Sequence, residues 1–304
     1  MNAEKFKGLG VAMITPFNQD GSIDFPALTK LTHFLIDGGV NYLVVQGTTG
    51  ESPVLTKDEK QAVLKCVSDA NAGRLPVVYG VGGNNTAAIA ESFKSLDKNL
   101  VDGILSVSPY YNKPTQEGIY QHYKVLAEST DLPIILYNVP GRTSSNVLPD
   151  TTLRLAKDFK NIVAVKEASG NLEQIMDIIN RKPEGFLVIS GDDGITLPIL
   201  AAGGDGVISV IGNGFPHAFS AMVRAAMSDN MEEARRLHYL LFPMVPLLFV
   251  EGNPGGIKEV TANLGITTNK VRLPLVNVSE ATRNKIVALT GNICKAFPYD
   301  LIKK

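Results

Sequence analysis

Lys166 is the residue whose position most clearly suggests chemistry, because it directly follows a short apolar run, Ile162 to Val165. Side chains alternate along a β-strand, so Lys166 would share a face with Ile162 and Ala164. If that face points into an apolar barrel, burial disfavours the ammonium form and supplies the free amine that condensation with a carbonyl group needs. The alternatives are a lysine that reaches solvent beyond the strand, or one that pairs with Glu167.

Tyr137 ends the preceding apolar run, so its phenol is expected to approach Lys166 from the neighbouring strand. A phenol that is hydrogen-bonded to a hydroxyl, such as that of Thr48, can move protons while a Schiff base forms and collapses. The alternative is a core tyrosine whose hydroxyl donates to a backbone carbonyl group.

Two turns could bind carboxylates. Residues 47–50, with the sequence Gly-Thr-Thr-Gly, could present backbone N–H groups and two hydroxyls to an anion. Arg142 lies in a Pro-Gly turn, where its guanidinium could clamp a second carboxylate through two hydrogen bonds. The alternatives are an ordinary polar turn before a helix and an exposed turn arginine.

Metal and nucleotide chemistry have little support. Cys66 and Cys294 are far apart, and the four histidines are scattered without metal-ligand spacing, so neither a disulfide framework nor a zinc site is expected. The glycine-rich segment 80–85 lacks both the full dinucleotide-binding pattern and a phosphate-loop lysine. We therefore expect no metal and no organic cofactor.

The elements that must position these residues alternate along the chain. Eight short apolar runs recur at intervals of about 20 to 35 residues, the length of a βα unit, at 10–15, 42–46, 76–79, 103–107, 133–137, 162–166, 186–190 and 206–210. Segments with helical spacing lie between them, at 25–36, 57–70, 87–96, 117–128, 151–159 and 172–179. This alternation predicts a parallel sheet, either closed as a barrel or open and doubly wound. In a barrel the active site lies at the carboxyl ends of the strands, where the polar residues follow the apolar runs.

The strand pattern stops near Phe215, and the remaining sequence predicts helices at 218–226, 231–241, 257–264 and 280–289. We expect an α/β fold, a (β/α)₈ TIM barrel over residues 1–214 with a C-terminal helical extension, residues 215–304, packed on it.

The net charge and the hydropathy of the chain limit its possible binding partners and its expected location in the cell. The formal net charge of −1 provides no basic field for nucleic acid or anionic lipid. The sequence has no apolar run long enough to span a membrane and no secretory leader at its start, so a cytoplasmic protein is expected.

Several motifs in this order closely resemble the dihydrodipicolinate synthase family, and the resemblance covers essentially the whole chain. The motifs are Gly-Thr-Thr-Gly-Glu at 47–51, Pro-Tyr-Tyr-Asn at 109–112, Tyr-Asn-Val-Pro-Gly-Arg-Thr at 137–143, Val-Lys-Glu-Ala-Ser-Gly at 165–170 and Gly-Asp-Asp at 191–193. Spaced motifs together are far more specific than any one of them.

The resemblance implies that Lys166 forms a Schiff base with pyruvate and that the enamine attacks L-aspartate-4-semialdehyde to give 4-hydroxy-tetrahydrodipicolinate, in lysine and diaminopimelate biosynthesis. It also implies that Tyr137 and Thr48 belong to a proton relay, which Tyr111 of a neighbouring subunit completes. The family is usually a homotetramer, built as a dimer of tight dimers.

The same resemblance implies four substrate-binding residues. Thr49 and the backbone around it would hold the pyruvate carboxylate, and Ile208 would line the pyruvate pocket through its backbone. Gly191 would also contact substrate, and Arg142 would hold the carboxylate of the semialdehyde.

Two other functions remain open on the sequence. One is a related pyruvate-dependent lyase such as N-acetylneuraminate lyase, from which Arg142 and the 47–50 turn distinguish this chain. The other is a non-catalytic barrel that only binds carboxylates, which a fold alone does not exclude.

One departure from the family concerns feedback by lysine. Lysine-inhibited members bind the amino acid with a glutamate where this chain has Ala88, and often carry histidine where it has Lys57 and Lys60. The missing carboxylate and the cationic neighbours disfavour an ammonium ligand. We expect a vestigial lysine site and weak or absent inhibition, although other residues of the site are retained, namely Ser52, Asn84 and Tyr110.

Overall fold

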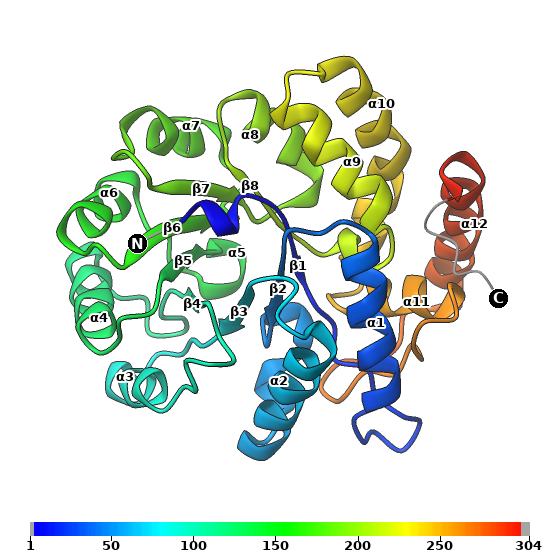
Figure 1. Cartoon of the computed structure of the whole chain (residues 1–304), viewed down its shortest axis with the longest axis horizontal. Helices are drawn as coiled ribbons and strands as arrows, with labels where there is room; N and C mark the ends of the chain where they lie inside the picture. Colours follow the sequence, from blue (N-terminus) through cyan, green and yellow to red (C-terminus); the bar gives the residue numbers. More distant parts are fainter. Residues whose placement is uncertain (1–2, 299–304) are drawn as a thin grey trace.

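Eight parallel strands form a closed barrel in sequence order, with β8 paired to β1 (Figure 1). The computed structural model describes residues 3–298. The strands are β1 Gly8–Ala12, β2 Tyr42–Val45, β3 Val77–Gly80, β4 Gly103–Val107, β5 Ile134–Asn138, β6 Ile162–Glu167, β7 Leu187–Ser190 and β8 Gly206–Ser209. The predicted TIM barrel is confirmed, and the open doubly wound sheet is excluded.

The helices between the strands form a ring outside the barrel (Figure 1). Six of them lie where helical spacing predicted them: α1 Phe25–Asp37, α2 Lys57–Asn71, α3 Thr86–Lys94, α4 Gln116–Glu128, α6 Pro149–Asp158 and α7 Leu172–Arg181. The short helices α5 Pro140–Thr143 and α8 Thr196–Ala201 were not anticipated, because they are too brief to show a period.

The first strand begins and ends earlier than the expected 10–15. The Met13 N–H group still donates to the Val44 carbonyl group of β2 at 2.9 Å. The next N–H group, that of Ile14, donates to the Asn213 side chain at 3.1 Å instead of to a strand. Asn213 also donates to the Ala12 carbonyl group at 2.8 Å. This one side chain therefore ends the strand at the mouth of the barrel.

Inward side chains fill the barrel, as the alternation along each strand requires. Val44, Leu105, Ile135 and Ala164 belong to one buried cluster inside it. Tyr42 is also inside, and a Cβ atom at Gly10 would lie 2.2 Å from its ring, so only glycine fits there.

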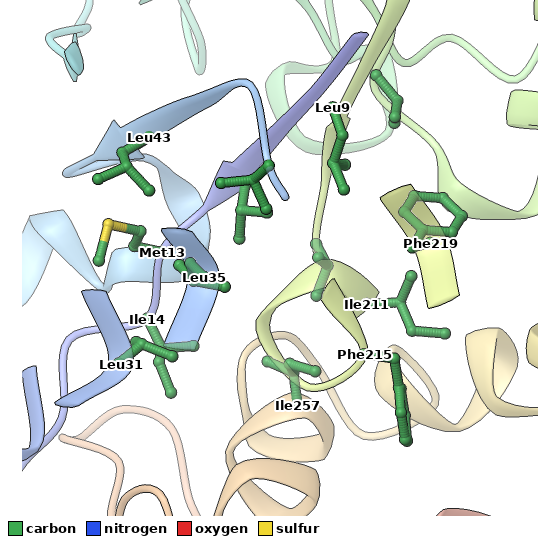
Figure 2. Close-up of a cluster of buried hydrophobic side chains, with 14 of the residues drawn as sticks. Leu9, Met13, Ile14, Leu31, Leu35, Leu43, Ile211, Phe215, Phe219 and Ile257 are labelled. Carbon is green, nitrogen blue, oxygen red and sulfur yellow. The ribbon is translucent and has the colours of Figure 1, made fainter. Parts of the chain in front are cut away.

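The chain after β8 forms the four helices that the sequence predicted, α9 Pro216–Met227, α10 Met231–Leu241, α11 Gly255–Asn263 and α12 Glu280–Ala296, with a 3₁₀ segment, η6 Phe242–Leu248, between α10 and α11. Helix α9 contacts β1, α1 and α8, and α10 packs on α9. Side chains of β1, α1, α9 and α11 share one core, which includes Leu9, Leu31, Phe219 and Ile257 (Figure 2).

The division at 214/215 stays a prediction, and its outermost residues, 1–2 and 299–304, lie outside the described residues. Within residues 3–298, no helix combines the length and the apolar character needed to cross a membrane.

Candidate active site

Lys166 lies on β6 inside the mouth of the barrel, in register with Tyr137 on β5 and Ile189 on β7. Lys166 is only 5% exposed, so its side chain does not extend into solvent. Its Nζ lies 4.2 Å from the centre of the Tyr137 ring. Glu167 is also buried but engages other partners, and Lys166 forms no salt bridge within residues 3–298. Both alternatives for Lys166 are therefore wrong, and a buried amine without a countercharge is suited to act as a nucleophile.

Tyr137 is buried at the end of β5, as the sequence predicted. Its hydroxyl makes no hydrogen bond to the described part of the chain, so the interpretation as a core tyrosine held by a backbone carbonyl group has no support. A direct hydrogen bond between Tyr137 and Thr48 is likewise not formed in residues 3–298. The relay between these two residues stays a prediction.

The 47–50 turn forms a 3₁₀ helix, η2 Thr48–Gly50, directly after β2. Thr49 is 2% exposed, and its Oγ1 accepts a hydrogen bond from Asn253 Nδ2 at 3.0 Å. The Thr49 hydroxyl thus keeps its proton available for an anion. Thr15 fixes the other side of the turn by donating to the Gly50 carbonyl group at 2.7 Å.

Arg142 is exposed on α5, and it forms no salt bridge with residues 3–298. The turn that carries it is anchored at its far end, where the Val147 N–H group donates to Asn138 Oδ1 at 2.9 Å. Asn138 Nδ2 in turn lies 3.1 Å from both oxygens of Glu167, the neighbour of Lys166. The arginine is therefore free to bind an anion while its turn is tied to the strand that carries the lysine.

Gly191 lies against the stem of Lys166. A Cβ atom there would be 3.1 Å from Lys166 Cε and 2.7 Å from the Ala168 Cβ, so a side chain would displace the lysine. Ile208 is 1% exposed on β8, beside Gly10 of β1. Both residues lie at the strand ends, as expected, but their contacts with substrate stay a prediction.

Asp193 lies two residues after Gly191, in a motif that was recognised in the sequence without a role for this residue. Its Oδ2 accepts from the N–H groups of Val210 and Ile211 at 3.0 and 2.8 Å, which ties the loop after β7 to the loop after β8. Burial raises the pKa of this carboxyl to about 6, against the lowering effect of these N–H groups. The side chain thus holds the backbone of Val210 and Ile211, which follows Ile208 and Ser209 at the end of β8.

Tyr111 is 87% exposed and has a φ of 76°, so the loop after β4 holds its ring away from its own barrel. Tyr110 is also exposed, and its carbonyl group accepts from Asn84 Nδ2 at 3.1 Å. Ser52 begins the 3₁₀ helix η3 Ser52–Val54, directly after the 47–50 turn. The structure thus brings together Asn84 and Tyr110 of the expected lysine site.

Sequence reasoning missed the residues that support the turn after β2. Glu51 forms an ion pair with Lys258 at 2.5 Å, and Asn253 reaches Thr49 from the same C-terminal segment. A charged residue among the apolar positions of a helix was the available signal, because Lys258 lies between Ile257 and Val260, which are both buried.

A TIM barrel with a buried lysine at the end of its sixth strand, packed against a tyrosine of the fifth, defines a lyase of the Schiff-base, class I aldolase type. The sequence matches the model of the dihydrodipicolinate synthetase family over residues 5–292. The chain belongs to this family.

Individual relatives agree with this assignment. The chain is 54% identical over 292 residues to a 4-hydroxy-tetrahydrodipicolinate synthase of Flavobacterium psychrophilum, with 96% of this chain and all of that protein (100%) covered. The crystal structure of dihydrodipicolinate synthase from Thermotoga maritima is 42% identical, with a TM-score of 0.91 and coverage of 96% of this chain and 99% of that one. A structure described as a monomeric dihydrodipicolinate synthase variant is also 42% identical, with a TM-score of 0.91 and coverage of 98% of both chains.

The expected family, fold and enzyme class are confirmed, and so is the expected synthase activity, pyruvate condensation in lysine and diaminopimelate biosynthesis. The comparisons do not favour the sugar-acid lyase or the non-catalytic barrel.

Proposed function

We propose that Lys166 and Tyr137, with Thr48 and the partner subunit's Tyr111, catalyse the condensation of pyruvate with L-aspartate-4-semialdehyde to 4-hydroxy-tetrahydrodipicolinate. The observation that carries this proposal is the buried Lys166 amine, 4.2 Å from the centre of the Tyr137 ring at the mouth of the barrel. An amine that has no countercharge and lies beside a phenol is arranged for covalent catalysis with proton transfer.

The reaction starts when Lys166 Nζ attacks the keto carbon of pyruvate, and loss of water gives the imine. Loss of a methyl proton then gives the enamine, whose carbon forms a bond to the aldehyde carbon of the semialdehyde. The amine of the semialdehyde finally attacks the imine carbon, which closes the ring and releases Lys166. Tyr137 and Thr48 move the protons of these steps, because each hydroxyl can both donate and accept.

The carboxylates of the two substrates would be held by different turns. Thr49 and the backbone of its turn bind the carboxylate of pyruvate, beside Gly191 and the backbone of Ile208. Arg142 binds that of the semialdehyde, for which its exposed guanidinium is available.

Reduction with borohydride in the presence of pyruvate tests the proposal. The expected product is a stable adduct on Lys166, with a mass gain equal to pyruvic acid less one oxygen atom. Lys258, which is more deeply buried but paired with Glu51, is an internal control and should remain unmodified in the same peptide map. A map in which Lys166 carries no adduct would overturn the proposal.

We also propose a cytoplasmic homotetramer, built as a dimer of dimers with barrels over residues 1–214 and helical extensions over 215–304. The exposed Tyr111 supports the dimer, because a relay residue that faces away from its own barrel needs a partner's site. Sedimentation velocity measures the assembly. A related variant is described as monomeric, so a monomer is a real alternative. A single species of monomer mass would contradict the proposed tetramer.

Feedback by lysine is proposed to be weak or absent. Ala88 offers no carboxylate, and Lys57 and Lys60 begin the helix that follows Ser52. Activity should persist when lysine is titrated at saturating pyruvate. Strong inhibition by submillimolar lysine would overturn this expectation.

A further inference from the structure

A buried ionic cluster joins the turn after β2 to the C-terminal segment, and the proposed chemistry does not use it. Lys258 of α11 and Glu51 form an ion pair at 2.5 Å, and both side chains are at most 1% exposed. The Arg272 N–H group donates to the second oxygen of Glu51 at 2.9 Å. The Arg272 guanidinium pairs with Glu59 of α2 at 2.6 Å, so both carboxylates of the cluster are engaged.

Phe17 forms the apolar side of this cluster. Lys258 Nζ lies 4.0 Å from the centre of its ring, and the Arg272 guanidinium carbon lies 4.5 Å from it. Lys258 also donates to the Lys270 carbonyl group at 2.7 Å. The ammonium group is therefore fixed from three directions, and it can hold Glu51 in one place.

Glu51 needs such an anchor because of its backbone. It has a φ of 54° and a ψ of 33°, the left-handed conformation that residues with a Cβ atom rarely adopt. Its N–H group caps the 3₁₀ turn by donating to the Thr48 carbonyl group at 3.1 Å. The position of the Glu51 side chain is thus coupled to the backbone of Thr48 and Thr49.

A second contact from the same segment reaches this turn. Asn253, five residues before Lys258, donates to Thr49 Oγ1 at 3.0 Å and is itself buried. The C-terminal segment therefore contacts the turn at its centre and at its end.

We propose that Lys258 and Glu51 are positioning residues, whose ion pair sets the 47–50 turn in the geometry that binds the pyruvate carboxylate. The inference rests on the proposed function, in which this turn holds pyruvate and Arg142 holds the semialdehyde. The C-terminal segment thereby controls the affinity for one of the two substrates without touching either.

Two variants test the pair. Lys258→Met keeps most of the side-chain volume and removes the charge, and Glu51→Gln keeps the shape and an acceptor for Arg272. In both, the KM for pyruvate should rise by about tenfold or more, because the turn loses the ion pair that holds it. The KM for the semialdehyde should stay within about twofold, because Arg142 lies on a separate turn.

This split distinguishes positioning from general stability. Loss of folded protein lowers the apparent kcat but leaves both KM values unchanged, and borohydride trapping with saturating pyruvate counts the active sites. Arg283→Gln is the matched control. It breaks a 3.0 Å ion pair between Arg283 of α12 and Glu259, the neighbour of Lys258 in α11, and this ion pair does not involve the 47–50 turn. Its pyruvate KM should equal that of the wild type.

The outcomes separate the two proposals. An unchanged pyruvate KM in folded Glu51→Gln overturns the positioning role, even if Lys258→Met fails to fold. Equal increases in both substrates' KM values also overturn it. Failure of the wild-type protein to form the Lys166 adduct instead overturns the proposed function.

Discussion

The backbones of Tyr137 and Lys166 pair in register across β5 and β6, and the lysine Nζ lies 4.2 Å from the centre of the tyrosine ring. The ring and the hydroxyl of Tyr137 therefore have separable contributions. The ring packs against the lysine amine, whereas only the hydroxyl can transfer a proton.

Tyr137→Phe keeps the ring and removes the hydroxyl. We expect kcat to fall by roughly 10²- to 10⁴-fold, the range for loss of a general acid–base group. The thermal midpoint should change little, because the packing of the ring is retained. Steady-state kinetics and a thermal melt measure both quantities, and a kcat close to that of the wild type would exclude Tyr137 from proton transfer.

Gly191→Ala should displace the lysine. The added Cβ atom would lie 3.1 Å from Lys166 Cε and 2.7 Å from the Ala168 Cβ, both closer than side chains normally approach. The rate of borohydride trapping with pyruvate should therefore fall. Gly291→Ala, in α12 with open space around the new atom, is the control, and should leave trapping unchanged and add about 0.5 to 1 kcal/mol of stability. Equal trapping rates in the two variants would contradict the expected crowding.

Arg142→Ala should affect only one substrate. The kcat/KM for the semialdehyde is expected to fall on the order of 10- to 100-fold, as for loss of hydrogen bonds to a charged group, while the KM for pyruvate stays the same. Arg154→Ala is the control, because Arg154 of α6 pairs with Glu117 of α4 in the outer ring of helices. It should leave the semialdehyde kcat/KM and the pyruvate KM unchanged. Unaltered semialdehyde turnover in Arg142→Ala means that the clamp has been assigned wrongly.

Tyr111 should act in the partner's site. Lys166→Ala and Tyr111→Phe are each expected to be nearly inactive alone, but a mixture that exchanges subunits should regain activity. Each hybrid dimer has one site with an intact Lys166 and an intact Tyr111 from the other chain. If Tyr111 served its own barrel, mixing would restore nothing, and activity of the mixture against time distinguishes these cases.

His122 should make the protein sensitive to acid. Burial lowers its pKa to about 4, from an ordinary value of 6.5, and Thr86 Oγ1 contacts its Nδ1 at 2.8 Å. Because the folded-state pKa is depressed, the folded state binds the proton more weakly than the unfolded chain, so stability falls as the pH decreases from 6.5 towards 4.

The change is measurable against a variant that does not titrate. Between pH 7.5 and pH 5, the free energy of unfolding of the wild type should fall by about 2 kcal/mol more than that of His122→Gln. Urea unfolding at the two pH values measures this difference. Parallel changes in the two proteins would show that His122 is not the titrating group.

The strands and the longer helices could be predicted because their signals are local. Continuous apolar runs and helical spacing located all eight strands and the four helices after β8, with the largest error at β1. That error has a long-range cause, since Asn213, about 200 residues away in the chain, takes over the Ile14 N–H group and ends the strand. Helix α8 was missed because six residues are too few to define a period.

The sequence by itself determined where the proposed reacting residues lie in the fold, because strand alternation and the polar ends of apolar runs depend only on neighbouring positions. It predicted that Lys166 and Tyr137 end neighbouring strands and lie side by side, as they do in the register of β5 and β6. Only the tertiary structure decided what supports them. The pairs Glu51 with Lys258 and Thr49 with Asn253 join residues more than 200 positions apart, and such contacts arise from the closure of the barrel and the packing of α11 on it. Local sequence patterns do not encode these distances, because they depend on how the whole chain folds.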